Sequence, residues 1–460
     1  MTPFAPLSSP TRPEERRQLP LWSLVVATFF MVSGGAYGTE EIVSGAGYAG
    51  AVIVLLLTPL LWSMPVALMV GELGSALPRE GGYYAWVCKG LGRVWGFQEA
   101  WLSLAASIFD MAIYPTLFVL YLTRLCPWFG VEHRGTLVGV AVVVLCVALN
   151  IAGVQLVAYT SVWLFVLLSA PFVAIVFLAP FHQGALAQTS VPADPGFGLA
   201  GGILVAMWNY MGWDNASTIA TTVRRPQQTY PRAMWVAVLL VSSSYLLPVA
   251  AVWLTGMPAG GFQTGAWADI TGLLGGPWLR ALTVAGAMLS AFGMFNALVL
   301  SYSRLPLAMA EDGMLPSVFA HLHPRTRTPW VSIVVLGAAW ALCLELGFER
   351  LVTLDILFYG ASLVLEFLTL AVLRITAPQL PRPFAVPGGL TAAILLGVCP
   401  VALLGFALVR SGEAEIFGLN ALAFGAILFG AGFLLYFLMT RVSRAGNQQS
   451  AISSQPDQDQ

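Results

Sequence analysis

Four carboxylates lie in otherwise apolar stretches of the sequence, and they are the residues best suited to chemistry. Glu40 and Glu41 directly follow a glycine-rich segment. Asp110 lies inside a long apolar run, and Asp214 comes two residues after Gly212. No Lys or Arg lies near the centre of these stretches. A carboxylate at membrane depth without a basic partner either takes up a proton or binds a cation. The pattern therefore predicts a site for a positively charged ligand.

Asp214 is the first candidate for binding an ammonium group. Trp208 and Trp213 flank it, and the face of an indole ring attracts a cation. The alternative is that Asp214 pairs structurally with a neighbouring helix. Because ionisable residues at membrane depth are functional by default, we favour the ammonium site.

The other carboxylates differ in how they are placed. Glu40 and Glu41 are adjacent, so on a helix they point about 100° apart and cannot both face one cavity. Asp110 lies mid-span, four residues before Tyr114. We weigh two roles for it equally, as a proton carrier and as a direct contact to the substrate.

The remaining reactive residues predict neither a metal site nor a cofactor site. Glu72 and Glu99 lie toward the ends of apolar stretches, where solvation or a loop contact is expected. The five cysteines are scattered without a CxxC pair. The four histidines fall in predicted loops without a carboxylate cluster that could complete a metal shell.

The composition places this chemistry in a membrane. Of the 460 residues, 58% are hydrophobic and 9% are charged, whereas soluble domains carry about 25% charged residues. Such a chain cannot cover itself with a polar surface, so we expect the lipid bilayer to surround it. The net charge of −1 gives no attraction to nucleic acid, and we expect no nucleic-acid partner.

Twelve apolar stretches are long enough to cross a hydrocarbon core of about 30 Å. They lie near residues 21–45, 48–72, 94–122, 136–152, 154–180, 199–222, 234–256, 279–303, 330–347, 351–374, 393–410 and 417–440. The sequence therefore predicts an all-α integral membrane protein with twelve transmembrane helices. The polar segments 1–20 and 441–460 are predicted to be a disordered leader and a disordered tail.

The distribution of basic residues predicts the orientation of these helices. When the N-terminus is placed in the cytoplasm, sixteen of the 21 Lys and Arg residues fall in inside segments and five in outside segments. Basic residues concentrate on the cytoplasmic side of membrane proteins, and a different helix count would scramble this alternation. We expect a multi-pass protein of the cell membrane, inner or plasma, with both termini in the cytoplasm.

Glycine interrupts two of the predicted helices. The first contains Ser33, Gly34 and Gly35, and the sixth contains Gly212. Small residues alone are also typical of a packing face between helices. Their combination with membrane-depth carboxylates in two helices favours a transport site at the middle of the membrane.

The two interrupted helices also predict an internal symmetry. The first enters the membrane from the inside and the sixth from the outside, as the opening helices of two halves with opposite topology do. We therefore predict an inverted repeat of five plus five helices, in residues 21–180 and 199–374. Two further helices follow in residues 393–440.

Several motifs resemble those of the amino acid–polyamine–organocation transporter superfamily, over about residues 22–374. They are Gly71-Glu72 with residues 78–83, Pro226 with residues 231–233, and residues 308–316 with Thr328-Pro329. Within the superfamily, the chain is most similar to the polyamine uptake branch of plants and protozoa. That likeness rests on residues 33–40, 95–98, 110–115 and 208–214.

The resemblance implies a leucine-transporter-like fold and proton-coupled uptake of a small cationic amine by alternating access. A polyamine has no carboxylate, so its site needs acceptors alone. We expect the substrate to be bound by Ser33, Gly34, Gly35, Glu40, Asp110, Trp208, Tyr210, Trp213 and Asp214. We expect Glu40 or Asp110 to carry the coupling proton.

Other functions compete with this interpretation. The first is a permease for neutral or cationic L-amino acids, acting by symport or antiport. Proton-coupled amino acid carriers of the superfamily often carry a lysine in helix five, and residues 152–180 contain none. A membrane enzyme is disfavoured because no nucleophile with a base and no paired acidic metal motif is visible. A channel is disfavoured because no repeated pore loop is visible. The sequence does not predict the oligomeric state.

Overall fold

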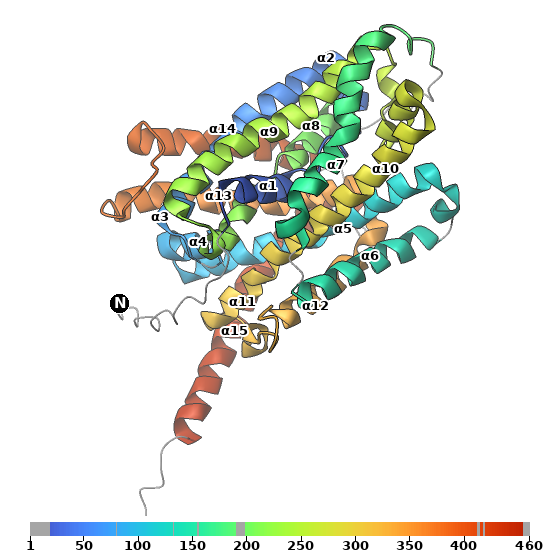
Figure 1. Cartoon of the computed structure of the whole chain (residues 1–460). Coiled ribbons are helices and arrows are strands. Elements are labelled where there is room, and N and C mark those ends of the chain that lie inside the picture. Colours follow the sequence, from blue (N-terminus) through green and yellow to red (C-terminus); the bar gives the residue numbers. More distant parts are fainter. Residues whose placement is uncertain are drawn as a thin grey trace, which may run out of the picture.

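The structure is a computed structural model, and its chain forms a bundle of helices (Figure 1). The described residues are 19–79, 81–131, 133–153, 156–189, 198–411, 415–416 and 419–453. Most of the predicted leader and the end of the predicted tail lie outside these residues. Two short strands, β1 (Glu415–Ile416) and β2 (Leu419–Asn420), pair antiparallel between the last two helices.

The first part of the chain, to residue 178, forms seven α-helices. They are α1 (Leu21–Val32), α2 (Glu40–Thr58), α3 (Met64–Ala76), α4 (Tyr83–Leu91), α5 (Arg93–Leu125), α6 (Arg134–Ile151) and α7 (Leu156–Leu178). A π-helical stretch, Pro59–Ser63, joins α2 to α3, so the two continue as one helical rod.

The second part forms eight α-helices and a longer 3-10 helix, η4 (Asp214–Thr222). The α-helices are α8 (Gly198–Asn209), α9 (Pro226–Leu254), α10 (Ala266–Tyr302), α11 (Arg304–Glu311), α12 (Trp330–Leu342), α13 (Phe348–Thr376), α14 (Gly389–Ser411) and α15 (Ala421–Ser453). Short 3-10 turns lie at Pro127–Gly130, Ala179–His182, Ala259–Gly261, Ser317–Ala320 and Leu344–Leu346.

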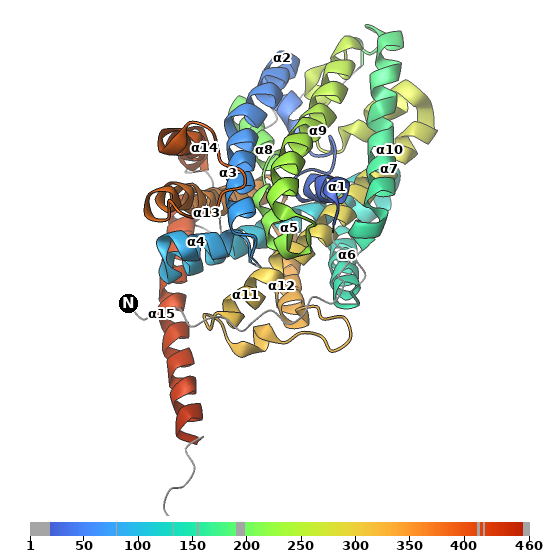
Figure 2. The ribbon, with the colours of Figure 1, turned by 60° about the vertical axis from the view of Figure 1, so that its left-hand side comes forward.

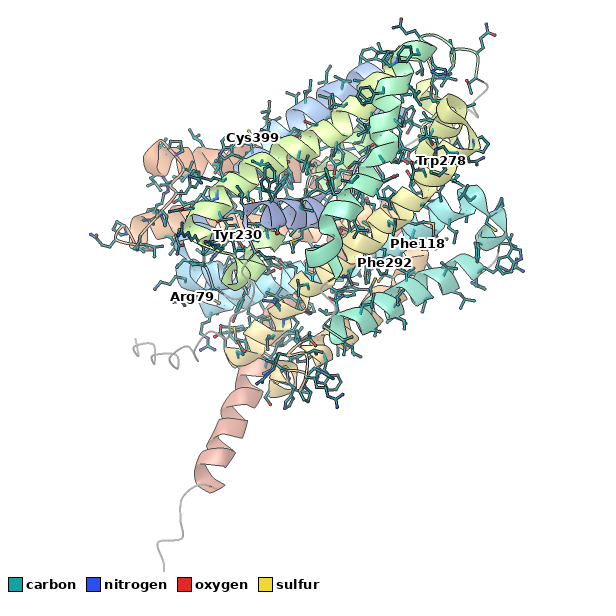
Figure 3. The ribbon with its side chains drawn as sticks, viewed as in Figure 1. Arg79, Phe118, Tyr230, Trp278, Phe292 and Cys399 are labelled. Atoms are coloured by element: carbon teal, nitrogen blue, oxygen red, sulfur yellow. The ribbon has the colours of Figure 1, made fainter. Side chains whose placement is uncertain are left out.

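The described helices suit a membrane. Nine of them are long and apolar enough to cross a bilayer, and Leu21–Val32 and Trp330–Leu346 are shorter apolar helices. Large apolar side chains cover the outside of the bundle, among them Trp278, which is 73% exposed (Figure 3). In water such a surface would be unfavourable, but lipid tails solvate it. The prediction of an all-helical multi-pass membrane protein is confirmed.

The chain breaks its helix between α1 and α2. Gly35 and Gly38 have φ values of 84° and 86°, in the left-handed region that a residue with a Cβ rarely adopts. Ser33 leaves α1 in an extended conformation, with φ −144° and ψ 139°. The predicted interruption of the first helix is therefore present, and it covers residues 33–39.

A second break lies between α8 and η4. Gly212 has φ 87°, and a Cβ at this position would lie 2.5 Å from the carbonyl oxygen of Met31 at the end of α1. The Asn209 side chain donates a hydrogen bond of 3.1 Å to the Gly38 carbonyl oxygen. The two breaks therefore lie directly against one another, although they are far apart in the sequence.

The broken helices lie inside the bundle. Figures 1 and 2 show α1 in the middle, and α7, α9 and α10 contact it. α2 packs on α8, and α5 packs on α13. α14 and α15 lie at the side of the bundle in Figure 2, away from α7. This arrangement buries the polar backbone of both breaks in protein, as a membrane requires.

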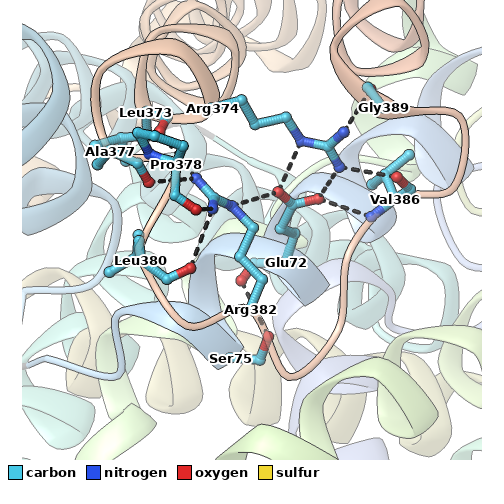
Figure 4. A network of polar contacts seen from close by, with 10 residues as sticks. All are labelled: Glu72, Ser75, Leu373, Arg374, Ala377, Pro378, Leu380, Arg382, Val386 and Gly389. Carbon is cyan, nitrogen blue, oxygen red and sulfur yellow. Dashed lines mark hydrogen bonds and ion pairs between the residues drawn. The ribbon is translucent and has the colours of Figure 1, made fainter.

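A buried ion-pair network fixes the end of α3 to α13. The Glu72 carboxylate, 0% exposed, accepts a hydrogen bond of 2.5 Å from Nη2 of Arg374 and lies 3.3 Å from Nε of Arg382 (Figure 4). The backbone N–H of Val386 donates to the same carboxylate at 2.7 Å. Glu72 thus makes the loop contact that the sequence analysis expected, and all its acceptor positions are used.

The C-terminal end of the chain differs from the prediction. α15 continues as a helix to Ser453, where the sequence analysis expected disorder after residue 440. No proline occurs between residues 440 and 453, and extending an existing helix is far easier than nucleating one. β2 lies at the start of the twelfth predicted span, so the helix begins at Ala421 rather than near residue 417.

Candidate functional site

A cavity lies where the two helix breaks meet α5, α10 and α13. Its lining residues are Met31, Val32, Ser33, Gly34, Tyr37, Asp110, Tyr114, Leu117, Tyr121, Trp208, Asn209, Met211, Gly212, Asn215, Ala287, Ser290, Ala291, Met294, Tyr302, Asp355 and Tyr359. Two of these residues are acidic and none is basic. The cavity therefore presents negative charge and aromatic faces to a ligand.

Asp110 lies in the wall of this cavity and accepts hydrogen bonds from three aromatic residues. The Tyr114 hydroxyl donates to Oδ1 at 2.7 Å, and Nε1 of Trp208 donates to the same oxygen at 3.4 Å. The Tyr302 hydroxyl donates to Oδ2 at 3.4 Å. These donors stabilise the charged form of the carboxylate and hold it in one orientation.

Asp355 on α13 is the second carboxylate of the cavity, and the sequence analysis missed it. Its side chain is 2% exposed, and no hydrogen bond to it is found among the described residues. It lies within electrostatic range of Asp110 and Asp214. An unbonded carboxylate in an apolar bundle is costly unless a cation or a proton joins it. Asp355 is therefore the cavity group with the most free acceptor capacity.

Asp214 lies behind the wall of the cavity. The Tyr359 hydroxyl donates to its Oδ1 at 2.5 Å and accepts a hydrogen bond of 3.1 Å from the Gly212 N–H. Tyr359 lines the cavity and Asp214 does not. In this conformation the Tyr359 hydroxyl therefore lies between Asp214, the predicted ammonium partner, and the cavity.

Glu40 is fully buried and does not line the cavity. Its carboxylate accepts hydrogen bonds from the Gly38 N–H at 2.7 Å, the Gly265 N–H at 2.9 Å and the Tyr121 hydroxyl. It joins the start of α2 to α5 and to the start of α10. The neighbouring Glu41 also lies outside the cavity, where it binds the N–H and the hydroxyl of Thr264 at 2.9 and 2.6 Å.

The other predicted site residues divide into two groups. Ser33, Gly34 and Trp208 line the cavity together with Asp110, whereas Gly35, Tyr210 and Trp213 do not. The Tyr210 hydroxyl donates to the Leu55 carbonyl at 3.1 Å, and Nε1 of Trp213 donates to the Tyr210 carbonyl at 2.8 Å. These two aromatic residues support the helix break from behind.

The contacts of Gly34 agree with both interpretations of the glycine segment, as part of a transport site and as a packing face between helices. The Ser290 hydroxyl donates to the Gly34 carbonyl oxygen at 2.6 Å. A Cβ on Gly34 would clash with Ser290 and would lie 2.6 Å from the Met294 sulfur. Gly34 therefore lines the cavity and also permits close packing of the break on α10.

Two cavity residues, Asp355 and Tyr359, and the nearby Glu366 could have been found from the sequence. Asp355, Tyr359 and Glu366 all fall inside the tenth predicted span, 351–374, and a carboxylate inside a span is the same signal that identified Asp110. This helix contains no glycine break, so the signal that identified the first and sixth helices does not point to it. Tyr302 and Asn215 carried no comparable signal.

The described titratable residues outside the cavity do not form a metal centre. Among the described residues, no group of three or more His, Cys, Asp or Glu side chains is placed to hold a metal ion. Cys88 lies on α4, and its burial raises the pKa of the thiol to about 12. This thiol stays protonated at neutral pH and is a weak nucleophile.

Comparisons with known proteins agree with this architecture. The relatives include polyamine transporter RMV1 of Arabidopsis thaliana, 35% identical over 434 residues, which cover 92% of this chain and 87% of the relative. Polyamine transporter PUT1 of Oryza sativa subsp. japonica is 34% identical, over 90% of this chain and 78% of its own length. Serine/threonine exchanger SteT of Bacillus subtilis is 26% identical, over 70% of this chain and 74% of its own length.

The family comparison covers most of the chain. The family model described as amino acid permease matches residues 25–429, which include both helix breaks and the whole cavity. The matched proteins are named as transporters rather than as enzymes. The chain belongs to the amino acid permease family and is a membrane transporter.

Proposed function

We propose that the protein is a secondary active transporter that takes up a small cationic amine, a polyamine, by proton-coupled alternating access. The observation that carries the proposal is the charge of the cavity. Asp110 and Asp355 line it together with aromatic side chains, and no basic side chain does. An ammonium group entering this space gains charged hydrogen bonds and the attraction of the aromatic faces.

The helix breaks support a substrate without a carboxylate. An amino acid carrier of this type binds the substrate carboxylate with free backbone N–H groups at a broken helix. Here the Gly35 N–H donates to the Ser33 hydroxyl at 3.1 Å, and the Gly38 N–H donates to Glu40 at 2.7 Å. In the second break the Gly212 N–H donates to the Tyr359 hydroxyl. Three of the N–H groups at the two breaks are thus already used, which favours a polyamine.

The alternative is a permease for neutral or cationic L-amino acids. It is supported by the family description and by the name of the exchanger SteT. The carboxylate of such a substrate would bind N–H groups of the breaks other than these three, such as that of Gly34 in the cavity wall. Symport and antiport both suit this alternative.

We further propose the twelve-helix topology with an inverted repeat of five plus five helices. The nine candidate spans, the two shorter apolar helices and α8 with η4 together support that number. Each half opens with a broken helix, and each contains a reversal at a glycine, Gly47 and Gly276, with φ values of 66° and 76°. The distribution of the basic residues supports a protein of the cell membrane with both termini in the cytoplasm.

The coupling proton is proposed to bind Asp110 or Glu40. Asp110 lines the cavity, so its protonation would respond directly to an arriving cation. Glu40 does not line the cavity but contacts Tyr121, which does. One residue therefore separates Glu40 from the cavity. Asp110 is therefore the first residue to test.

Uptake by purified protein in liposomes tests the proposal. Labelled putrescine, spermidine, arginine, serine and leucine are offered with and without an imposed pH gradient. We expect saturable, gradient-driven accumulation of the polyamines. Accumulation of amino acids alone would establish the alternative.

The same liposomes test the coupling residue. Asp110→Asn should lose accumulation against a gradient but keep exchange of labelled for unlabelled substrate, because exchange moves no net proton. Loss of both activities in well-folded Asp110→Asn protein would assign Asp110 to binding. Retention of both in Asp110→Asn and in Glu40→Gln would remove both residues from the coupling step.

A further inference from the structure

A buried polar stripe runs along α13, from the cavity toward the end of the helix that carries Arg374. Its members are Asp355, Tyr359, Ser362, Glu366 and Thr369, and none is more than 4% exposed. Their spacing alternates between four and three residues, which places them on one face of the helix. A helix buried among apolar neighbours does not need such a face, because buried polar groups cost free energy unless they are satisfied.

The neighbouring helix α5 carries a matching stripe. Its members are Glu99, Ser103, Asp110 and Tyr114, all buried. α5 and α13 pack against one another. Asp110 lies within electrostatic range of Asp355, and Glu99 lies within electrostatic range of Glu366. The two helices therefore run in opposite directions with their polar stripes facing each other.

These stripes hold two separate pairs of carboxylates. On each helix the two acidic residues are eleven positions apart, which corresponds to a rise of about 16 Å. The first pair, Asp110 and Asp355, lines the cavity, whereas Glu99 and Glu366 do not. The second pair is therefore a distinct site, closer to the end of the bundle that the basic residues assign to the cytoplasm.

The second pair is buried without enough partners. Both oxygens of Glu366 and one oxygen of Glu99 have no hydrogen-bond partner in the described part of the chain. The other Glu99 oxygen accepts a hydrogen bond of 2.8 Å from Ser103. The Tyr83 side chain is fully buried and lies within electrostatic range of both carboxylates.

In the part of the chain that the structure describes, no basic side chain is bonded to this pair to offset its negative charge. Arg374, on the same helix as Glu366, is bonded to Glu72, and Lys89 of α4 is exposed. Arg93, at the start of α5, donates to the Asp312 carbonyl oxygen. Among the described residues, the other titratable groups within range of the pair are Asp214, Tyr83, Tyr359 and Cys88, which are acidic or neutral.

The other described helices that pack against α13 do not offset the negative charge of the pair. α8 has no charged residue, and the segment 421–440 of α15 has none either. α14 contributes only Arg410, near its far end. Two buried carboxylates within electrostatic range of one another are unfavourable when both are ionised in such surroundings, because neither desolvation nor mutual repulsion is compensated.

We propose that Glu99 and Glu366 form a second proton-binding site, in which the two carboxyl groups share at least one proton and exchange it with the cavity through Asp214 and Tyr359. Asp214 lies within electrostatic range of both glutamates, and Tyr359 bonds it to the cavity wall. In each transfer one O–H bond breaks as another forms on the next oxygen, so no oxidant or reductant is needed. The place of this site in the transport cycle rests on the proposed proton coupling, but the presence of the proton does not.

Infrared spectroscopy of the purified protein tests the presence of the proton without transport. The spectra of Glu99→Gln and Glu366→Gln are subtracted from that of the unmodified protein at neutral pH, in H2O and in D2O. We expect a protonated carboxyl band that shifts in D2O and is lost in at least one of the two variants. Glu345→Gln is the matched control, because the Glu345 side chain is 69% exposed, and it should remove only an ionised carboxylate band. Loss of only ionised bands in both glutamate variants would overturn the proposal.

Transport by the same variants tests the role of the site. Both variants should bind putrescine within about twofold of the unmodified protein, because they leave the cavity intact, while pH-driven accumulation should fall at least tenfold. Unchanged accumulation in both variants would overturn the role of the pair as a proton relay. If the unmodified protein accumulates no polyamine, the proposed function fails, and the infrared result still decides whether the proton is present. Because glutamine resembles a neutral carboxyl group, both variants are expected to fold.

Discussion

Glu72 and Glu366 are the same amino acid at the same burial, 0% exposed, yet their surroundings differ completely. Glu72 is bonded to two arginines and a backbone N–H, as Figure 4 shows. Glu366 has no partner on either oxygen among the described residues. Both side chains are fully buried, so the degree of burial cannot explain the difference.

The comparison shows that burial alone does not tell a structural carboxylate from a functional one. A buried charge with a full set of donors is fixed in one state, and removing a partner is strongly destabilising. A buried carboxyl group without partners can be neutral in one state and charged in another, which a transport cycle requires. Asp269 adds a third case, because it pairs with Arg124 and Arg280 at 3.0 and 3.1 Å but is 40% exposed.

The largest effect is expected at Glu72. Glu72→Gln keeps the shape of the side chain but leaves Arg374 and Arg382, only 10% and 14% exposed, without their counter-charge. Breaking a buried ion pair in this way costs about 3–5 kcal/mol. The matched change Glu366→Gln should cost less than about 1 kcal/mol, because it replaces a neutral group without partners. Unfolding of both variants in detergent measures the difference, and equal losses would contradict the comparison.

The next effect concerns ligand binding rather than stability. Asp355→Asn removes the cavity charge that has no donor, so polyamine affinity should fall by about 1.5–3 kcal/mol as a charged hydrogen bond is lost. Asp214→Asn should weaken binding less, since Asp214 acts from behind Tyr359. Calorimetric titration with spermidine measures both. A larger loss at Asp214 than at Asp355 would show that the substrate reaches Asp214 in another conformation.

A smaller effect is expected at the link between the cavity and the second pair. Tyr359→Phe removes the hydroxyl that donates to Asp214 and accepts from Gly212. The expected loss of stability is about 1–3 kcal/mol, because a buried carboxylate loses its donor. If Tyr359 carries the proton, accumulation falls more than exchange does. An equal fall in both would assign the hydroxyl to structure alone.

The smallest effect is expected at Asp269. Asp269→Asn removes a carboxylate that two arginines contact, as Glu72→Gln does, but water screens this pair. Exposed ion pairs contribute about 0–1 kcal/mol, so unfolding should shift only slightly and should become independent of salt at this site. A loss as large as that of Glu72→Gln would mean that exposure does not separate the two networks.

The sequence predicted the glycine breaks and one wall of the cavity because their signals are local. Gly35 and Gly212 stand beside carboxylates in apolar runs, and Asp110 and Trp208 lie in the cavity wall. Asp355 and Glu366 carry a signal of the same kind, in an α-helix without a break, and the analysis overlooked it. The alternation of four and three residues from Asp355 to Thr369 is visible without coordinates.

The role of Glu40 could not be predicted from the sequence. Its partners Tyr121 and Gly265 are 81 and 225 residues away in the chain, and only the tertiary fold brings them to the first turn of α2. The same limit holds for Asp214. Its distance from the cavity is set by Tyr359, which is 145 residues away.

The carboxylate of Glu40 also has a kinetic consequence. It bonds segments of three different helices at the side of the bundle opposite to the second carboxylate pair, so any swing of the first turn of α2 away from α10 must break those bonds. The barrier to opening on this side is then largely enthalpic, and the turnover rate should rise steeply with temperature. Glu40→Gln should flatten the Arrhenius slope of exchange, and an unchanged slope would show that this side of the bundle opens without moving this turn.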